Sequence, residues 1–146
     1  MFSKKVAAAM LLAAVPSAAM AATEVVVHRD PGCGCCEKWV QAVRAKLGWK
    51  VAVRDDAART SFQQRVGMPR QLSSCHTAVV NGMVFEGHVP IADMKRVLAT
   101  RPAGIRGLAV PGMPLGSEGM EVPGVPRQPY AVIAFGPNGQ SVYARH

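Results

Sequence analysis

Three of the four cysteines of this chain, Cys33, Cys35 and Cys36, lie within one short segment, and the fourth is Cys75. A disulfide between such near neighbours would close almost no loop and would add little stability. The chain must therefore fold around a hydrophobic core rather than around a disulfide framework. The crowding of the thiols is better explained by chemistry than by a structural role.

The first 21 residues have the three parts of a secretory signal peptide. Lys4 and Lys5 form a basic start, an apolar run follows, and Ala19-Met20-Ala21 is the small-residue pattern that a signal peptidase recognises. The apolar run is much shorter than the roughly 20 residues of a membrane-spanning helix. We therefore expect cleavage after Ala21, a periplasmic protein without a membrane span, and a single domain over residues 22–146.

The mature part begins with alternating strand and helix patterns. Residues 24–28 are a β-branched run before a turn and predict a buried strand. Apolar residues then recur at helical spacing from residue 37 to a stop at Gly48, so the cysteines are expected on the loop that enters a helix. Residues 50–54 predict a second strand, and residues 57–66 predict a second helix.

A hairpin and a third helix follow. Asn81-Gly82, between apolar residues 77–80 and 83–86, is a strong signal for a two-residue hairpin turn. Pro90 is a favoured first residue for the helix that the apolar spacing up to Leu98 indicates. The order strand-helix-strand-helix-hairpin-helix predicts an α/β protein with a thioredoxin-like fold.

The last third of the chain differs in composition. Residues 104–129 are rich in Gly, Pro and Met and predict a long extended loop. Residues 130–135 and 141–143 then predict a C-terminal β-hairpin around a Gly-Pro-Asn-Gly turn.

The cysteine cluster has the composition of a soft-metal site. Three thiolates on one loop raise one another's pKa and need a compensating cation. Cys75 precedes the third strand, which in a thioredoxin-like domain faces the loop after the first strand, so it can supply a fourth thiolate. Four thiolates suit Cu(I), Zn(II) or an iron–sulfur cluster. The adjacent Cys35 and Cys36 strain a single tetrahedral zinc site, whereas thiolates that bridge several Cu(I) ions tolerate crowding.

Other candidate ligands are secondary. Met113 and Met120 lie on the Gly/Pro-rich loop, where metal contact and apolar packing explain their thioethers equally well. His76 adjoins Cys75 and is a further candidate, whereas His28 and His88 end strands and are expected to be structural.

Four separated motifs carry a family resemblance: DPGCGCCEKWV, SSCHT with its continuation NGMVFEGHVP, VPGMPLGSEGME, and PYAVIAF. Together they resemble the CopG family of small periplasmic copper-resistance proteins, the thioredoxin-like, cysteine-rich DUF411-type family. The resemblance implies a cysteine-bridged multinuclear Cu(I) centre at Cys33, Cys35, Cys36 and Cys75, with several copper ions per chain. It also implies a role in copper tolerance beside other periplasmic copper-handling proteins.

Two other functions are compatible with parts of the sequence. A thiol–disulfide oxidoreductase could use Cys33-Gly34-Cys35-Cys36 as its C-x-x-C motif. The third thiol, Cys75 and the lack of a proline before the third strand argue against it, so a binding protein rather than an enzyme is favoured. The formal net charge of +8 could serve nucleic acid, but export and the scattering of basic residues without aromatic neighbours argue against that partner.

Overall fold

The computed structural model describes residues 23–146. The predicted leader and its cleavage site lie outside the described residues. In chain order the elements are β1 (Glu24–Arg29), α1 (Gly34–Leu47), β2 (Lys50–Asp55), α2 (Arg59–Arg65), the 3-10 helix η1 (Arg70–Leu72), β3 (His76–Val80), β4 (Met83–Glu86), α3 (Ile91–Thr100), β5 (Gly107–Ala109), β6 (Ala131–Gly136) and β7 (Gly139–Arg145).

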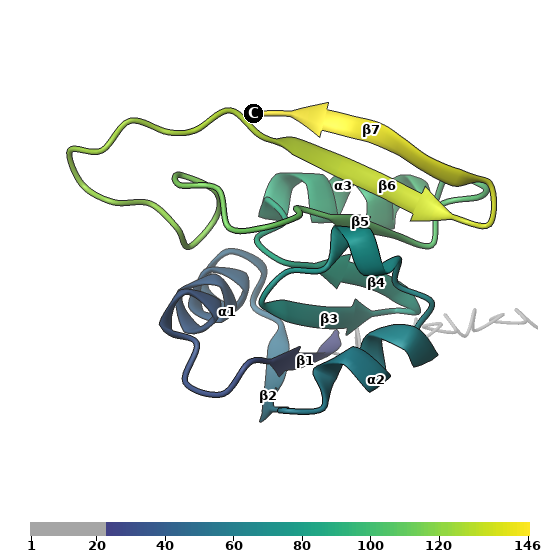
Figure 1. Ribbon diagram of the computed structural model, residues 1–146, viewed down its shortest axis with the longest axis horizontal. Helices are drawn as coiled ribbons and strands as arrows, with labels where there is room; N and C mark the ends of the chain where they lie inside the picture. The colour runs from purple at the N-terminus through teal and green to yellow at the C-terminus, as the bar shows by residue number, and fades with distance from the viewer. Residues whose placement is uncertain (1–22) are drawn as a thin grey trace, which may run out of the picture.

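The strands form one seven-stranded mixed sheet in the order β2-β1-β3-β4-β5-β6-β7, which runs from bottom to top in Figure 1. β1 is parallel to β2 and β4 to β5, whereas the other neighbours are antiparallel. The predicted α/β class is therefore confirmed, with three α-helices in the described part of the chain.

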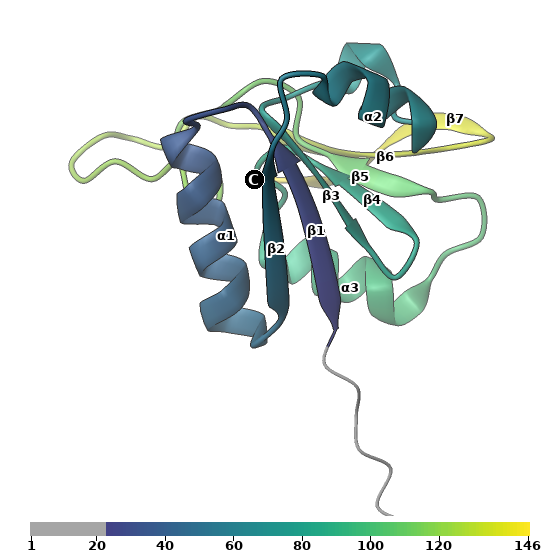
Figure 2. The ribbon, with the colours of Figure 1, turned by 90° about the horizontal axis from the view of Figure 1, so that it is seen from below.

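Helices cover both faces of the sheet. α1 and α3 lie on one face and α2 lies on the other (Figure 2). The alternation of side chains along the strands explains this arrangement. On β3, Ala78 and Val80 belong to the main core with Trp39 of α1, whereas Val79 packs against a smaller cluster on the opposite face that includes Met68.

The β3–β4 hairpin has the predicted two-residue turn. Asn81 and Gly82 have positive φ angles of 48° and 79°, as a type I′ turn requires. The turn fixes the register, in which Thr77 pairs with Glu86. This register sets which residues meet beyond the strand ends, where the candidate site lies.

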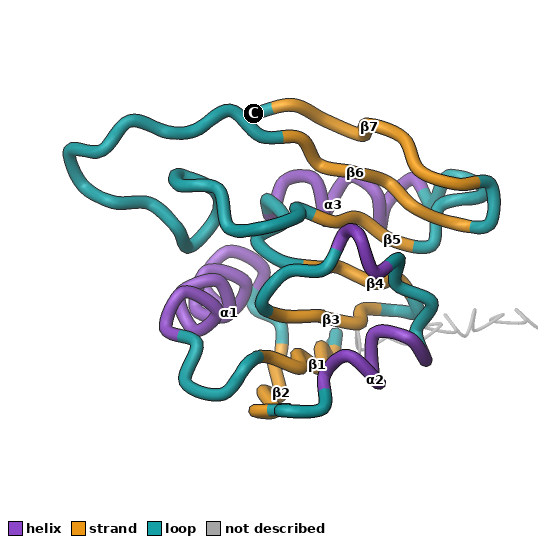
Figure 3. Tube along the Cα trace, viewed as in Figure 1, coloured by secondary structure: helices purple, strands orange, loops and turns teal. Residues whose placement is uncertain are grey.

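The predicted loop of residues 104–129 contains a strand that the sequence did not indicate. β5 is only three residues long, too short for a recognisable alternation, and it pairs with both β4 and β6. It thereby attaches the C-terminal hairpin to the sheet. The rest of the loop projects beside α1, as the teal segments in Figure 3 show.

No helix in the described part of the chain is long and apolar enough to cross a membrane.

Candidate metal centre

The start of α1 carries the cysteine cluster. Cys33 is the N-cap residue, and the backbone N–H of Cys36 points to Cys33 Sγ at 3.4 Å. A tight turn leads into it, in which Cys33 N–H donates to the Asp30 carbonyl and Gly32 has a φ of +72°, a left-handed conformation that glycine adopts without strain. The helix begins directly after the N-cap. The prediction that all three cysteines precede the helix is therefore wrong for Cys35 and Cys36.

Cys33 and Cys36 form a disulfide, and Cys35 and Cys75 are free thiols. This pairing was not expected from the sequence, because a disulfide at this spacing adds little stability. The helix start nevertheless permits it, because the N-cap side chain and the third helical residue face each other across the first turn. Cys35 Sγ lies 3.4 Å from Cys33 Sγ, so the free thiol sits beside the disulfide.

Cys75 meets the helix start as the sequence analysis expected. It directly precedes β3, whose pairing with β1 brings Arg29 opposite His76. The Asp30 N–H donates to the Cys75 carbonyl at 3.0 Å, and Cys36 Sγ lies 3.6 Å from that same oxygen. The four cysteine sulfurs all lie within 4.8 Å of one another. One cation, or a compact cluster of cations, can therefore contact all of them.

The electrostatic environment of Cys75 favours the protonated thiol. Burial, the largest cause, and the neighbouring Cys35 thiol together raise the pKa of Cys75 to about 12, although a hydrogen bond from Ser74 acts in the opposite direction. The thiol therefore keeps its proton at neutral pH unless a cation takes the place of that proton.

His88 is a neighbour of this site that the sequence analysis assigned to a structural role. Its Nε2 lies 3.2 Å from Cys75 Sγ, and its Nδ1 lies 2.8 Å from the carbonyl oxygen of Glu118. Because a carbonyl can only accept, Nδ1 carries the proton and Nε2 presents its lone pair to the thiol. A signal for this contact was present: counting outward from the Asn81-Gly82 turn places His88 opposite Cys75.

His76 is fully buried beside the same thiol. Its Nδ1 lies 3.5 Å from Cys75 Sγ, and its ring packs against Trp39 and edge-on to His88. Nε2 is buried and has no hydrogen-bond partner among the described residues. Desolvation holds the pKa of His76 well below its usual value, and burial also lowers the pKa of His88. Both rings are therefore neutral and able to ligate a metal.

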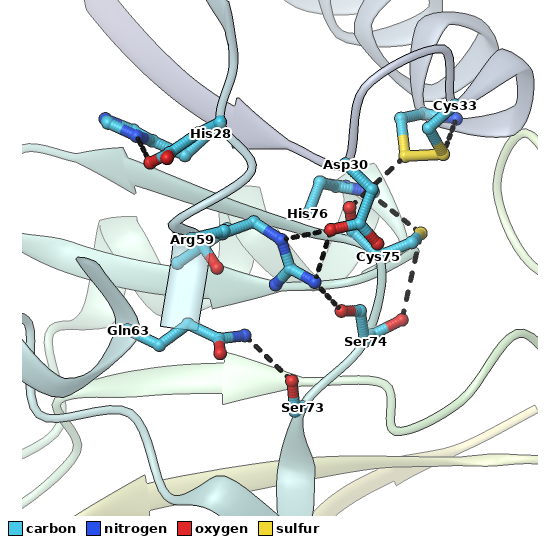
Figure 4. Close-up of polar contacts among 12 residues, drawn as sticks. His28, Asp30, Cys33, Arg59, Gln63, Ser73, Ser74, Cys75 and His76 are labelled. Atoms are coloured by element: carbon cyan, nitrogen blue, oxygen red, sulfur yellow. Dashed lines mark hydrogen bonds and ion pairs between the residues drawn. A yellow bond between two sulfur atoms is a disulfide. The ribbon is translucent and has the colours of Figure 1, made fainter. Parts of the chain in front are cut away.

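A buried ion pair under the Cys75 loop holds that loop in place. Arg59 of α2 donates to Asp30 and to the Ser74 carbonyl (Figure 4). It also donates to Glu86 at the end of β4. The Glu86 carboxylate also accepts the Ser74 N–H at 2.7 Å and further bonds from Gln63 and Thr77. Desolvation raises the pKa of Glu86, and these hydrogen bonds act in the opposite direction. The network ties the two cysteine-bearing loops to α2.

Comparisons with known proteins identify the family. A family model described as a protein of unknown function, DUF411, matches residues 72–120. Two solved structures described as copper resistance protein CopG, Form 1 and Form 2, are each 39% identical to this chain. They match with TM-scores of 0.79 and 0.78, and the match covers 86% of this chain and 98% and 99% of theirs.

This chain belongs to the CopG family. The resemblance found in its sequence motifs is thereby confirmed. A search of curated proteins finds no match.

The two methionines proposed as secondary ligands lie in different surroundings in this CopG-family chain. Met120 lines an open groove together with Cys35 and Lys38 at the start of α1. Met113 does not line this groove and is 54% exposed. The structure therefore brings Met120, but not Met113, to the groove beside the cysteine cluster. Metal contact by either thioether stays a prediction.

Proposed function

We propose that this protein is a periplasmic copper-binding protein that holds Cu(I) through Cys33, Cys35, Cys36 and Cys75 and contributes to copper resistance or homeostasis. The observation that carries the proposal is the convergence of four sulfurs within 4.8 Å from two separate segments. Thiolates are soft ligands that suit Cu(I). The likeness to structures described as copper resistance protein CopG supports copper as the metal.

Charge favours several Cu(I) ions over one. A single Cu(I) with four thiolates would carry a charge of −3 at a site where Cys36 and Cys75 are buried, and burying uncompensated charge is costly. Four Cu(I) ions bridged by four thiolates would be neutral. Bound Cu(I) would also offset the burial and the repulsion from Cys35 that keep Cys75 protonated in the metal-free protein.

Copper binding by all four cysteines requires the Cys33–Cys36 disulfide to be reduced. A thiol reductant would supply two electrons to the S–S bond, which breaks to give two thiols, while the reductant is oxidised to its own disulfide. The four thiols then release their protons as Cu(I) binds. His76 and Met120 are proposed as secondary ligands, since one adjoins Cys75 and the other lines the groove beside Cys35.

We further propose that residues 22–146 form one thioredoxin-like domain, exported by the leader and acting beside other periplasmic copper-handling proteins. The strand order β2-β1-β3-β4, with helices on both faces, supports this fold. The C-terminal hairpin would then be an extension of that sheet through β5.

Titration of reduced protein with Cu(I) under anaerobic conditions, against a competing Cu(I) chelator, tests the proposal. We expect more than one Cu(I) per chain and weak binding of Zn(II) to the reduced cysteine cluster. A thiol count before the titration must give four, which shows that the disulfide is open. Saturation at zero copper would contradict the proposal.

A thiol–disulfide oxidoreductase is the second candidate, and one observation favours it. The structure holds the disulfide of the C-x-x-C motif, with the half-buried Cys33 at a helix N-terminus, where a thiolate is stabilised. Rapid reduction of a disulfide substrate by the reduced protein, abolished by Cys33→Ser and unaffected by Cys75→Ser, would support this function in place of copper binding.

A further inference from the structure

We propose that Cys75, His76 and His88 form a second metal site, which binds one divalent ion, Cu(II) or Zn(II), while the Cys33–Cys36 disulfide is in place. The inference deepens the proposed function, because it shares Cys75 with the thiolate cluster, but it concerns a different oxidation state of the protein. The three ligand atoms all lie within 4.8 Å of one another, and all three residues are buried.

The backbone of the β3–β4 hairpin brings these residues together. Cys75 and His76 lie at the start of β3 and His88 lies just beyond the end of β4, where the Gly87 N–H donates to the His76 carbonyl at 2.8 Å. Gly87 has a φ of +69°, and a Cβ there would lie 2.6 Å from the Val110 carbonyl oxygen, so glycine lets the chain turn tightly before His88. The ligands are therefore held by a rigid element.

The distances fit a single tetrahedral ion. Metal–sulfur bonds of about 2.3 Å and metal–nitrogen bonds of about 2.0–2.1 Å at a tetrahedral angle place the two ligand atoms about 3.5 Å apart. Cys75 Sγ lies 3.5 Å from His76 Nδ1 and 3.2 Å from His88 Nε2. These two distances are within a few tenths of an ångström of that value, and one ligand atom of each residue lies within 4.8 Å of the other two.

The surroundings of both rings suit ligation. The Glu118 carbonyl fixes the tautomer of His88 so that Nε2 is unprotonated, which is the outer-shell contact that metal-bound histidines usually make. His76 is held by packing on Trp39 rather than by a full set of hydrogen bonds, since its Nε2 has no partner among the residues described. Coordination through Nδ1, the nitrogen that faces Cys75 Sγ, would place the ring proton on Nε2.

The donor set determines the class of metal. One thiolate and two imidazoles are of borderline softness and suit Zn(II) and Cu(II), the latter being the metal of trigonal sites with two histidines and a cysteine. The disulfide withdraws two thiolates from the cluster but leaves this set intact. The protein would therefore offer soft ligands to Cu(I) when reduced and a mixed nitrogen–sulfur set to a divalent ion when the disulfide is closed.

Metal titrations of the disulfide form under anaerobic conditions test the site. A thiol count of two confirms that form, and Zn(II) binding is then measured against a chromophoric chelator. We expect one Zn(II) per chain and, in a separate titration with Cu(II), a visible thiolate-to-copper charge-transfer band. A Zn(II) site without the Cu(II) band identifies zinc as the ion that fits, and the reverse identifies copper.

Variants of the two histidines test which residues bind the divalent ion. His88→Gln, which keeps a donor for the Glu118 carbonyl, and His76→Phe, which keeps packing on Trp39, should each weaken binding by at least about tenfold. His28→Gln should not, because His28 pairs with Asp56 and stacks on Phe62 away from the site.

Binding of the divalent ion should be unaffected by Cys35→Ser, since Cys35 does not belong to the donor set of Cys75, His76 and His88. Thermal unfolding shows which variants fold, and if His88→Gln does not fold, His76→Phe decides. Absence of divalent-ion binding, binding that both histidine variants leave intact, or its loss in Cys35→Ser would overturn the second site. None of these outcomes alters the Cu(I) titration of the reduced protein, which tests the proposed function separately.

Discussion

At the scale of single residues, exposure divides the cysteines into two pairs. Cys36 and Cys75 are buried, whereas Cys33 and Cys35 are half-buried at the surface of the helix start. Under the proposed function, the outer pair would meet an incoming copper ion or thiol, and the inner pair would hold the metal away from water.

The first prediction concerns the inner pair. Cys75→Ser should reduce Cu(I) stoichiometry and affinity as much as Cys36→Ser, because each closes the cluster from one side and a serine hydroxyl is a hard, poorly ionised ligand. Anaerobic titration of both reduced variants against a Cu(I) chelator measures this. Ser74→Ala is the matched control, since its hydroxyl lies 3.9 Å from Cys75 Sγ but does not belong to the four-cysteine cluster. Full copper binding by Cys75→Ser alone would make Cys75 an ordinary buried thiol.

The second prediction is a pH dependence of the metal-free disulfide form. The pKa of Cys75 is about 12 in the folded protein, above its ordinary value of 9.0, so the folded state holds the proton more tightly than the unfolded state. This contribution to stability is fully present below about pH 9 and is lost as the pH rises toward 12. Denaturant unfolding across that range should show a steeper loss for the wild type than for Cys75→Ser. Equal slopes would show that the thiol does not titrate in this way.

At the scale of elements, the buried residues of α2 contact the sheet through an ion pair and hydrogen bonds rather than through a large apolar face. Arg59 and Gln63 are its buried residues, and both donate to the Glu86 carboxylate. The same contacts fix the backbone just before Cys75. The geometry of the candidate site thus depends on an element that carries none of its proposed ligands.

Removing the Arg59 cation from this network should lower the stability of the fold. Arg59→Met would leave the buried Glu86 without its counter-ion and should lower the free energy of unfolding by about 3–5 kcal/mol. The double variant Arg59→Met/Glu86→Gln should recover part of that loss, because the unpaired charge is gone. Arg65→Met, at the exposed end of α2, should change stability by less than about 0.5 kcal/mol. Urea unfolding of the three variants checks the order, and a near-neutral Arg59→Met would show that the pair does not stabilise the fold.

The Gly/Pro-rich loop between β5 and β6 packs closely against α1 at Gly119. Gly119 has a φ of +83°, and a Cβ there would lie 2.8 Å from the backbone nitrogen of Trp39. Gly124 has a similar φ of +76° with nothing within 4 Å of such a Cβ. Gly119→Ala should therefore be less stable than Gly124→Ala by about 1–3 kcal/mol, since only the first adds a clash to the same backbone strain. Thermal unfolding compares them, and equal losses would mean that the loop is not anchored at Gly119.

At the scale of the whole molecule, we propose that export by the leader decides where the thiols would meet copper. We predict that the mature protein begins at Ala22 and is recovered in the periplasmic fraction, because Ala19 and Ala21 occupy the positions that a signal peptidase recognises. The intact mass of the periplasmic material measures the first residue. Recovery of the full-length chain from the inner membrane would contradict this localisation.

Local patterns in the sequence were sufficient for most elements. Strands with β-branched alternation, the Asn81-Gly82 turn and the Pro90 helix start all depend on neighbours within a few residues, and the structure has each of them. The position of Cys75 beside the first helix also followed, because the expected order of strands implied it.

Only the tertiary structure decided the details of the site. The start of α1 at Gly34 depends on a cap made by Cys33 Sγ, and β5 exists because β4 and β6 supply its hydrogen bonds. The meeting of His88 with Cys75 requires both the hairpin register and the Glu118 carbonyl from a loop 30 residues away. The sequence by itself determined the cysteine cluster and its place in the chain order. Contacts between distant segments determined which nitrogens and sulfurs face one another. The spacing of residues along the sequence does not reveal burial or hydrogen bonds to remote groups.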